Sequence, residues 1–335
     1  MMSQDGLGQD LPDQQAKPAV SVALCTWNGS AFLQEQLESI ATQSLPPHEL
    51  VIFDDCSSDD SVEIAQKFAS AAPFPVRIHK NACNLGIREN FSGCIGACSG
   101  EIIVLSDQDD VWMTGKLERI ARSLNDNPGA AFAFSDALLV DRNLRPMASS
   151  LWQSLQFSGA QLRAFQQGHG LEVLLNRNVV TGATMAFRSC YRDILLPVPV
   201  GWLHDEWIAL LLSSVAWGVP VGEPLIRYRQ HGRQQIGGGR RSIYQQFLVA
   251  REMTRDDFRL DAEAYRAAEK RLQERAADAG RGAQALRQKV LHLDRRTRIH
   301  ASHLWRWPLV FRELWSGNYK RYSLGWKGLA QDVFL

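Results

Sequence analysis

Short apolar runs alternate with helical patterns in the first third of this 335-residue chain and limit its fold more than any other feature. The runs that have the length and composition of strands are residues 19–26, 49–53, 75–79 and 102–105. The segments between them that are predicted as helices are residues 31–43, 61–72 and 88–97. Strands and helices that alternate at this pitch build βαβ units. The sequence therefore predicts an α/β fold with a mostly parallel sheet flanked by helices.

Polar clusters stand where three of these predicted strands end. They are Thr26-Trp27-Asn28-Gly29, Asp54-Asp55 and Asp107-Gln108-Asp109-Asp110. In open α/β sheets, ligands bind beyond the carboxyl ends of the strands. The three loops are therefore expected to converge on one crevice.

The third cluster is the strongest chemical signal in the chain. Asp107, Asp109 and Asp110 place three carboxylates within four residues, after the buried run 102–105. Such carboxylates repel one another, so their position predicts a bound cation. An Asp-x-Asp pair can hold a hard divalent ion, which in turn holds phosphate oxygens. A solvated acidic turn is the alternative that this stretch leaves open.

Composition indicates a globular protein of the cytosol. The length allows one sizeable core with an appendage, or two modest domains. Six cysteines occur without CxxC pairs, as expected for reduced thiols. Residues 1–18 lack the apolar core of a signal peptide and are predicted to form a disordered leader. No window reaches about 18 uninterrupted apolar residues, so no membrane span is predicted.

The order of the motifs closely resembles that of the family 2 glycosyltransferases, which share the Rossmann-like GT-A fold. Those enzymes carry a Thr-Tyr-Asn-Gly-like turn, an Asp-Asp-Gly-Ser-like turn, an Asn-x-Gly-x-x-x-Asn-Phe segment and a Ser-Asp-Gln-Asp-Asp-Val-Trp-like segment. The matching stretches here are Thr26–Gly29, Asp54–Ser57, Asn84–Phe91 and Ser106–Trp112. The resemblance covers roughly residues 19 to 235. It is nearest to the rhamnosyltransferases of O-antigen, capsule and cell-wall polysaccharide assembly.

The resemblance implies a nucleotide site in residues 19–140. Thr26 and Asn28 would line the nucleotide, and Asp54 or Asp55 would accept a hydrogen bond from the imide of uracil or thymine. The alternative for this pair is an Asx turn that caps a helix. Cys56 replaces the usual glycine, so the backbone there is expected to differ.

The same resemblance assigns the metal ligands. Asp107 would contact the ribose or assist the metal, and Asp109 would bind Mg²⁺ or Mn²⁺ directly. Asp110 would reach the ion through water or cap the next helix. Arg229 and His231 would meet the leaving diphosphate, where cationic donors stabilise developing charge, and His231 is also a candidate metal ligand.

The acceptor half, residues 141–239, carries the second group of candidates. Gly182 and Thr184 match a segment that lies beneath the acceptor and the donor sugar. Asp205 matches the family's general base, and Glu206 is the second candidate for that role. His204 would orient the base or bind a sugar hydroxyl. Acids that stabilise a helix N-terminus, a structural histidine and a plain strand-end glycine are the alternatives.

Beyond this half the chain becomes basic and helical. Residues 240–335 hold 20 basic and 11 acidic residues, against 17 and 25 in residues 1–239. Aromatic and cationic residues alternate from His303 to Lys327, which suits the surface of an anionic membrane. A nucleic-acid backbone and a helical hairpin packed on the α/β domain are the alternatives, and no nucleic-acid partner is predicted. The glycine-rich run 234–241 is predicted as a mobile lid or a linker.

These features together predict an inverting, metal-dependent glycosyltransferase. The expected donor is a nucleoside-diphosphate sugar, with dTDP-rhamnose favoured over UDP-sugars, and the expected acceptor is a lipid-linked or surface glycan. The enzyme would work in the cytoplasm, peripherally at the inner face of the cell membrane. A sugar nucleotidyltransferase and a catalytically silent scaffold of a glycan-assembly complex are the alternatives.

Overall fold

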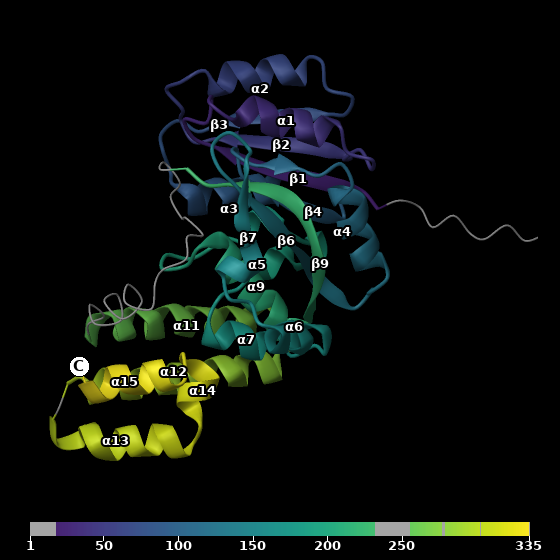
Figure 1. Ribbon diagram of the computed structural model, residues 1–335. Helices are drawn as coiled ribbons and strands as arrows, with labels where there is room; N and C mark the ends of the chain where they lie inside the picture. Colours follow the sequence, from purple (N-terminus) through teal and green to yellow (C-terminus); the bar gives the residue numbers. More distant parts are fainter. Residues whose placement is uncertain (1–17, 232–254, 277–278, 302, 335) are drawn as a thin grey trace, which may run out of the picture.

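The computed structural model describes residues 18–231, 255–276, 279–301 and 303–334 (Figure 1). The expected leader, apart from residue 18, and the predicted lid or linker at 234–241 lie outside the described residues. So does the start of the basic region.

Four parallel strands form one half of a nine-stranded sheet. They are β1 (Val20–Thr26), β2 (Glu49–Asp54), β3 (Val76–Lys80) and β4 (Ile102–Ser106), in the order β3-β2-β1-β4. Each lies within about two residues of its predicted range, a difference typical of strand ends. Thr26 pairs with Asp54 in the register, and Leu24 pairs with Ser106. The predicted polar clusters therefore start at the same edge of the sheet.

Helices cover both faces of this half, because successive strand residues point to opposite sides. Val22 and Leu24 of β1 pack in the core that includes Leu37 of α1 (Leu33–Ala41), and α2 (Ser61–Ala69) lies beside α1. Ala23 and Cys25 face the other core, with Phe91 of α3 (Ile87–Ala97). The predicted α/β fold with flanking helices is confirmed.

The second half of the sheet is mixed in direction. It contains β5 (Val111–Trp112), β6 (Ala130–Val140), β7 (Pro146–Ser150), β8 (Met185–Arg188) and β9 (Trp217–Arg229). β8 runs antiparallel to both β4 and β6, and β5 runs antiparallel to β9, whereas β6 and β9 are parallel. The parallel pairing predicted for the sheet thus holds for β1 to β4 and for the β6–β9 pair.

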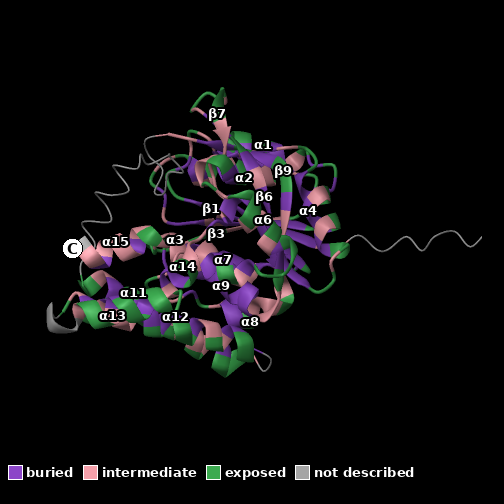
Figure 2. Ribbon diagram, turned by 60° about the horizontal axis from the view of Figure 1, so that its bottom comes forward, coloured by how far each residue is buried: buried purple, intermediate pink, exposed green. Residues whose placement is uncertain are grey.

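Helix α9 (His204–Val215) lies at the centre of the core that also contains Phe91 of α3. Nine of its twelve residues are buried, and Trp207 is completely enclosed (Figure 2). The other helices of this part are α4 (Lys116–Asn125), α5 (Leu151–Ser154), α6 (Gly159–Gln166), α7 (Gly170–Asn176) and α8 (Arg192–Leu195). Leu203 immediately precedes α9, so the first turn of this helix carries His204, Asp205 and Glu206.

The C-terminal region is helical, as predicted, and it packs on the α/β domain (Figure 1). Its helices are α11 (Arg255–Arg275), α12 (Gly280–Ile299), α13 (His303–Trp315), α14 (Asn318–Tyr322) and α15 (Trp326–Phe334). Lys289 of α12 donates to the carbonyl of Leu175 at 3.0 Å. A side chain at Gly282 would lie 2.3 Å from the carbonyl oxygen of Ser214, so this contact requires glycine. None of the described helices is long and apolar enough to cross a bilayer.

Candidate functional site

Gln108 joins the loops that follow β1 and β4. Its side-chain oxygen accepts from the hydroxyl of Thr26 at 2.7 Å and from the amide of Trp27 at 2.8 Å. The loop after β2 is joined to them as well, because the backbone amide of Asn28 donates to the hydroxyl of Ser57 at 2.9 Å. The three predicted loops therefore meet. Gln108 was not among the predicted site residues, although its place between two aspartates was a signal that could have found it.

Asp54 and Asp55 turn to different neighbours. Asp54 Oδ2 accepts from the backbone amide of Ser57, three residues on, at 2.9 Å, and its Oδ1 is buried without a partner among the described residues. Asp55 accepts from the amides of Leu85 and Gly86, both at 2.8 Å. It thereby ties the third predicted family motif to the end of β2.

Cys56 has a backbone conformation that glycine adopts more easily. Its φ is 61°, in the left-handed region that glycine favours. The expectation that the backbone here differs from that of the family's glycine stays a prediction. A non-glycine residue there is strained by about 1–2 kcal/mol.

The carboxylates of the acidic loop point in different directions. Asp109 Oδ2 lies 2.8 Å from Nε2 of His231, and both side chains are largely covered. Asp110 is fully buried; its Oδ1 accepts from the amide of Arg229 at 3.0 Å, and its Oδ2 has no partner among the described residues. Burial raises the pKa of Asp107 to about 7, and the negative charges of Asp109 and Asp205 add to the rise.

Arg229 supports this loop from inside the protein. The side chain is 2% exposed and stacks over Phe32, with its guanidinium carbon 4.5 Å from the ring centre. Its Nε donates to the carbonyl of Asp109 at 2.7 Å, and its Nη2 forms an ion pair with Glu35. The structure thus places Arg229 behind the acidic loop, where it fixes the backbone that carries Asp109.

Lys116 is a second buried cation beneath the loop. Its Nζ donates to the carbonyl of Ala183 at 2.7 Å and lies 3.7 Å from the ring centre of Trp112. Burial lowers the pKa of Lys116 to about 7, against the attraction of Asp110 and Asp107, which raises it. Lys116 connects the acidic loop to the segment around Gly182. No local pattern in the sequence indicates this role of Lys116, because only the fold brings α4 beneath that segment.

Asp205 faces the same segment from the first turn of α9. Its Oδ2 accepts from the amide of Gly182 at 3.0 Å, and its Oδ1 accepts from the amide of Glu206 at 2.8 Å. A side chain at Gly182 would stand 2.9 Å from Nε2 of His204 and 3.4 Å from Cβ of Asp205, so the close approach is to the helix. Thr184 is buried, and its hydroxyl donates to the carbonyl of Thr181 at 2.8 Å.

His204 is buried with neither ring nitrogen bonded to a described residue. Its ring stacks on Phe91, with 3.8 Å between the ring centres. Burial lowers the pKa of His204, although the charge of Asp205 opposes the shift. The ring is thus fixed by stacking, close to Gly182 and Asp205.

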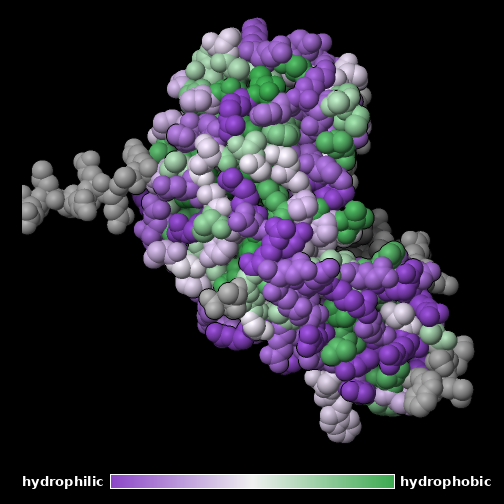
Figure 3. Space-filling view, turned by 180° about the vertical axis from the view of Figure 1, so that it is seen from behind, coloured by the Kyte–Doolittle hydropathy of each residue, from purple (hydrophilic) through white to green (hydrophobic). Residues whose placement is uncertain are grey.

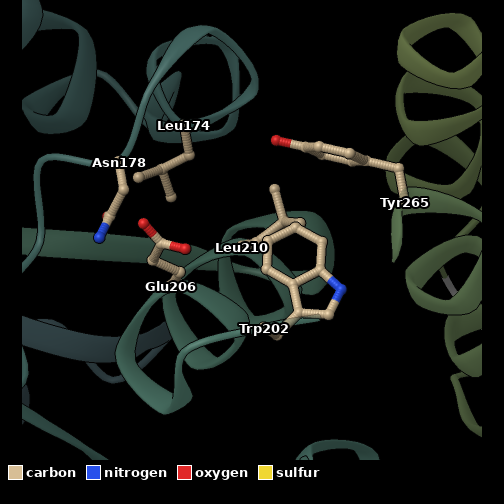
Figure 4. A pocket seen from close by; sticks show the side chains of 6 residues that line it. All are labelled: Leu174, Asn178, Trp202, Glu206, Leu210 and Tyr265. Carbon is tan, nitrogen blue, oxygen red and sulfur yellow. The ribbon is translucent and has the colours of Figure 1, made fainter. Parts of the chain in front are cut away.

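The side chain of Glu206 lies in different surroundings from that of Asp205. It lines a cavity of about 70 Å³ with Leu174, Asn178, Trp202, Leu210 and Tyr265 (Figure 4). Burial raises the pKa of Glu206 to about 7, and Asp205 and Asp261 raise it further. The two acids that were predicted as alternatives for one role therefore lie in different surroundings.

The acidic loop suits a hard cation that also binds a ligand. Within the described residues, no three His, Cys, Asp or Glu side chains are arranged as a complete metal cage. Asp109 and His231 do stand together at 2.8 Å, close to Asp107, whose burial and negatively charged neighbours raise its pKa to about 7. Magnesium usually takes one or two carboxylates and fills its other positions with phosphate oxygens and water. The donor set fits that kind of site.

Comparisons with known proteins agree with this arrangement. The family model described as glycosyl transferase family 2 matches residues 21–188, half of the chain. An uncharacterised protein of Mycobacterium tuberculosis (strain CDC 1551 / Oshkosh) is 32% identical over 61% of this chain and 66% of its own length. EpsE of Bacillus subtilis (strain 168), which is named as a glycosyltransferase, is 30% identical over 30% of this chain and 37% of its own. The chain thus spans less than two thirds of the length of these relatives.

Solved structures show the same fold. The crystal structure of S. aureus TarS 1–349 in complex with UDP-GlcNAc matches with a TM-score of 0.53 and 17% identity, over 82% of this chain and 72% of TarS 1–349. A second structure of S. aureus TarS matches with a TM-score of 0.57 and 13% identity, over 94% and 55% of the two chains. The predicted GT-A fold is confirmed.

Proposed function

The chain belongs to glycosyltransferase family 2, and we propose that its crevice transfers a sugar, with inversion, from a nucleoside-diphosphate sugar to a glycan acceptor. The observation that carries this proposal is the position of two carboxylate groups at the crevice. Asp107 and Asp109 follow β4, and Asp205 begins α9 close enough to raise the pKa of Asp107. One group suits the diphosphate, and the other suits the acceptor.

A divalent cation, Mg²⁺ or Mn²⁺, would be held by Asp109 and His231, with Asp107 beside it. When bound, such a cation neutralises charge on the diphosphate. Asp110 has turned inward to the amide of Arg229, so it holds the loop and does not reach the ion. Arg229 and Lys116 keep the backbone of this site in place.

Asp205 is the proposed general base. Both of its oxygens accept backbone hydrogen bonds, from Gly182 and Glu206, which favour the ionised carboxylate and fix its direction. It would take the proton of the acceptor hydroxyl as that oxygen attacks the anomeric carbon. Asp54 or Asp55 would accept the hydrogen bond of the pyrimidine imide, and dTDP-rhamnose remains the favoured donor, ahead of UDP-sugars.

Nucleotide binding tests this proposal directly. Isothermal titration with UDP and with dTDP should show binding that tightens when Mn²⁺ or Mg²⁺ is added. Asp109→Asn should abolish the metal effect, whereas Asp126→Asn, the same charge change at an exposed residue, should leave it intact. Metal-dependent hydrolysis across a panel of nucleotide sugars would then name the donor. Metal-independent binding in the unmodified chain would contradict the metal site.

We also propose that the C-terminal helices bind an anionic membrane surface, where a lipid-linked acceptor would be found. Helix α13 exposes Trp307, Phe311, Leu314 and Trp315 by 48–92% of their surface, at helical spacing along one face. Its inward face holds the charged Glu313, which is completely buried. The helix therefore presents its apolar side to the outside, as an interfacial helix does.

The charges around this face are of one sign. Both acids of the described tail from residue 303 onward, Glu313 and Asp332, are buried, whereas Arg312, Lys320 and Arg321 are exposed. Apolar and hydrophilic groups intermingle over these helices at the lower right of Figure 3. Cations beside exposed aromatic rings suit anionic headgroups.

Sedimentation with vesicles tests this surface. The chain should bind phosphatidylcholine vesicles that contain phosphatidylglycerol, and high salt should weaken the binding. Replacing Phe311 and Trp315 with serine should abolish it. Leu260→Ser, which changes an exposed apolar residue on α11, is the matched control. Equal sedimentation of the Phe311/Trp315 variant and the unmodified chain would refute the proposal.

A further inference from the structure

The cavity in Figure 4 lies where the C-terminal region meets the catalytic half of the chain. Leu174, Asn178, Trp202, Glu206 and Leu210 come from the α/β domain, and Tyr265 comes from α11. The cavity lies within electrostatic reach of the proposed general base, because the charge of Asp205, the preceding residue in the first turn of α9, raises the pKa of Glu206. The α/β domain alone would therefore leave the cavity without its Tyr265 wall.

The two aromatic walls are held rigidly. The indole nitrogen of Trp202 donates to the carbonyl of Ala264 at 3.1 Å, which fixes the ring against α11. The rings of Trp202 and Tyr265 meet edge to face, with 5.0 Å between their centres. Behind Tyr265, Nζ of the buried Lys289 lies 5.1 Å from the ring centre. Walls that are fixed before a ligand arrives reduce the entropy lost on binding.

The size of the cavity suits one small ring. Its volume of about 70 Å³ has room for several water molecules, which the ring of one sugar residue would displace. A longer glycan would have to extend out through the mouth.

The lining suits an uncharged ring that carries hydroxyl groups. Aromatic faces pack on the C–H face of a sugar, while the carboxyl group of Glu206 and the amide of Asn178 exchange hydrogen bonds with its hydroxyls. Figure 4 shows the Tyr265 hydroxyl and the Glu206 carboxyl group directed into the same space. An anionic ligand is disfavoured, because Asp205 and Asp261 also act on Glu206.

We propose that this cavity binds one uncharged sugar residue of the acceptor, and that α11 completes the acceptor site through Tyr265. The assignment rests on the proposed transferase function, since it places the bound sugar next to Asp205. It gives the C-terminal region a direct part in substrate recognition, separate from its proposed membrane surface. Glu206 is then an acceptor-binding residue, and Asp205 alone is the base.

Saturation-transfer NMR on the full chain tests the cavity without turnover. The probes are the methyl glycosides of glucose, N-acetylglucosamine, rhamnose and glucuronic acid. At least one neutral glycoside should bind, and the glucuronide should bind more weakly. Tyr265→Ala should weaken binding roughly tenfold, in line with the loss of one aromatic contact. Tyr265→Phe, a milder change that is safer for folding, should weaken it less.

Trp326→Ala is the matched control, because it removes an aromatic side chain that is 71% exposed on α15. It should leave glycoside binding unchanged. The proposal is overturned if no neutral glycoside binds, if the glucuronide binds best, or if Tyr265→Ala binds as tightly as the unmodified chain. Titration of the same proteins with UDP or dTDP and Mn²⁺ separates the two proposals. If no nucleotide binds, the transferase function is contradicted. The glycoside result still shows whether the cavity binds a sugar.

Discussion

Two groups of buried carboxylates, one at the crevice and one in the C-terminal region, differ in how their charge is balanced. Asp332 accepts from Arg296 at 2.8 Å, from His300 at 2.9 Å and from the hydroxyl of Tyr319 at 2.7 Å. Glu313 contacts His292 at 2.5 Å, Arg295 at 2.7 Å and Asn318 at 2.9 Å. Burial alone would raise the pKa of both acids, but these partners outweigh it and lower both values.

The acidic loop shows the opposite balance. Burial raises the pKa of Asp110 well above its usual value, and Asp109 and Asp107 raise it further. The nearby Lys116 donates its hydrogen bond to the carbonyl of Ala183. The C-terminal acids are thus balanced by partners within the protein, whereas Asp107 and Asp110 of the loop form no ion pair with a described residue. Buried carboxylates without a balancing cation mark a candidate binding site, whereas carboxylates that are paired with cations hold helices together.

The largest effect is expected when Asp205, the proposed general base, is replaced. Asp205→Asn should lower transfer by about 10²–10⁴-fold, because the amide cannot take the acceptor's proton. It should change the free energy of unfolding by less than about 1 kcal/mol, since the amide oxygen can still accept from Gly182. Steady-state kinetics and urea denaturation on one preparation measure both. Full activity of the Asp205→Asn variant would mean that another residue is the general base.

Replacing a paired carboxylate of the C-terminal region should have the opposite effect, on stability instead of activity. Asp332→Asn leaves Arg296 buried without its anion, so we expect a loss of about 3–5 kcal/mol in the free energy of unfolding. Urea denaturation followed by circular dichroism measures this loss. Asp294→Asn on α12 is the control, because its partner Arg266 on α11 is half exposed, and it should cost less than about 1 kcal/mol. Equal effects of the two changes would remove the distinction between the groups.

The pH dependence of stability gives the smallest effect. Burial lowers the pKa of His292 from its usual 6.5, so the unfolded chain gains a proton below that pH before the folded one does. The contribution of His292 to stability should therefore be lost as the pH drops below about 6.5, while Asp107 and Glu206, whose pKa values are raised to about 7, add stability in the same range. The contribution of Glu313 and Asp332 is lost below about 4, as they lose their charge. Urea midpoints of the unmodified chain and of His292→Asn at pH 8, 6 and 5 isolate the first contribution. The difference between the two proteins should shrink from pH 8 to pH 5, and a constant difference would contradict the role of His292.

Local patterns predicted much of the fold and part of the site. The apolar runs and polar clusters of residues 19–106 were sufficient to place β1 to β4 and the loops at their ends. They did not predict that Trp217 to Arg229 is one strand, or that β8 is antiparallel, because those pairings join residues far apart in the chain. At the site, the sequence identified the acids, but the structure separated Asp110, which faces inward, from Asp109, and Glu206 from Asp205.

The sequence by itself determined where the candidate carboxylates stand along the chain, because carboxylates at strand ends and a helix start are readable from local spacing. Only the tertiary structure decided what each one faces. Tyr265 and Glu206 are 59 positions apart and share a cavity, and α13 turns Glu313 inward and Trp307 and Trp315 outward. Such arrangements follow from the packing of whole helices, which fixes side-chain directions that no local pattern contains.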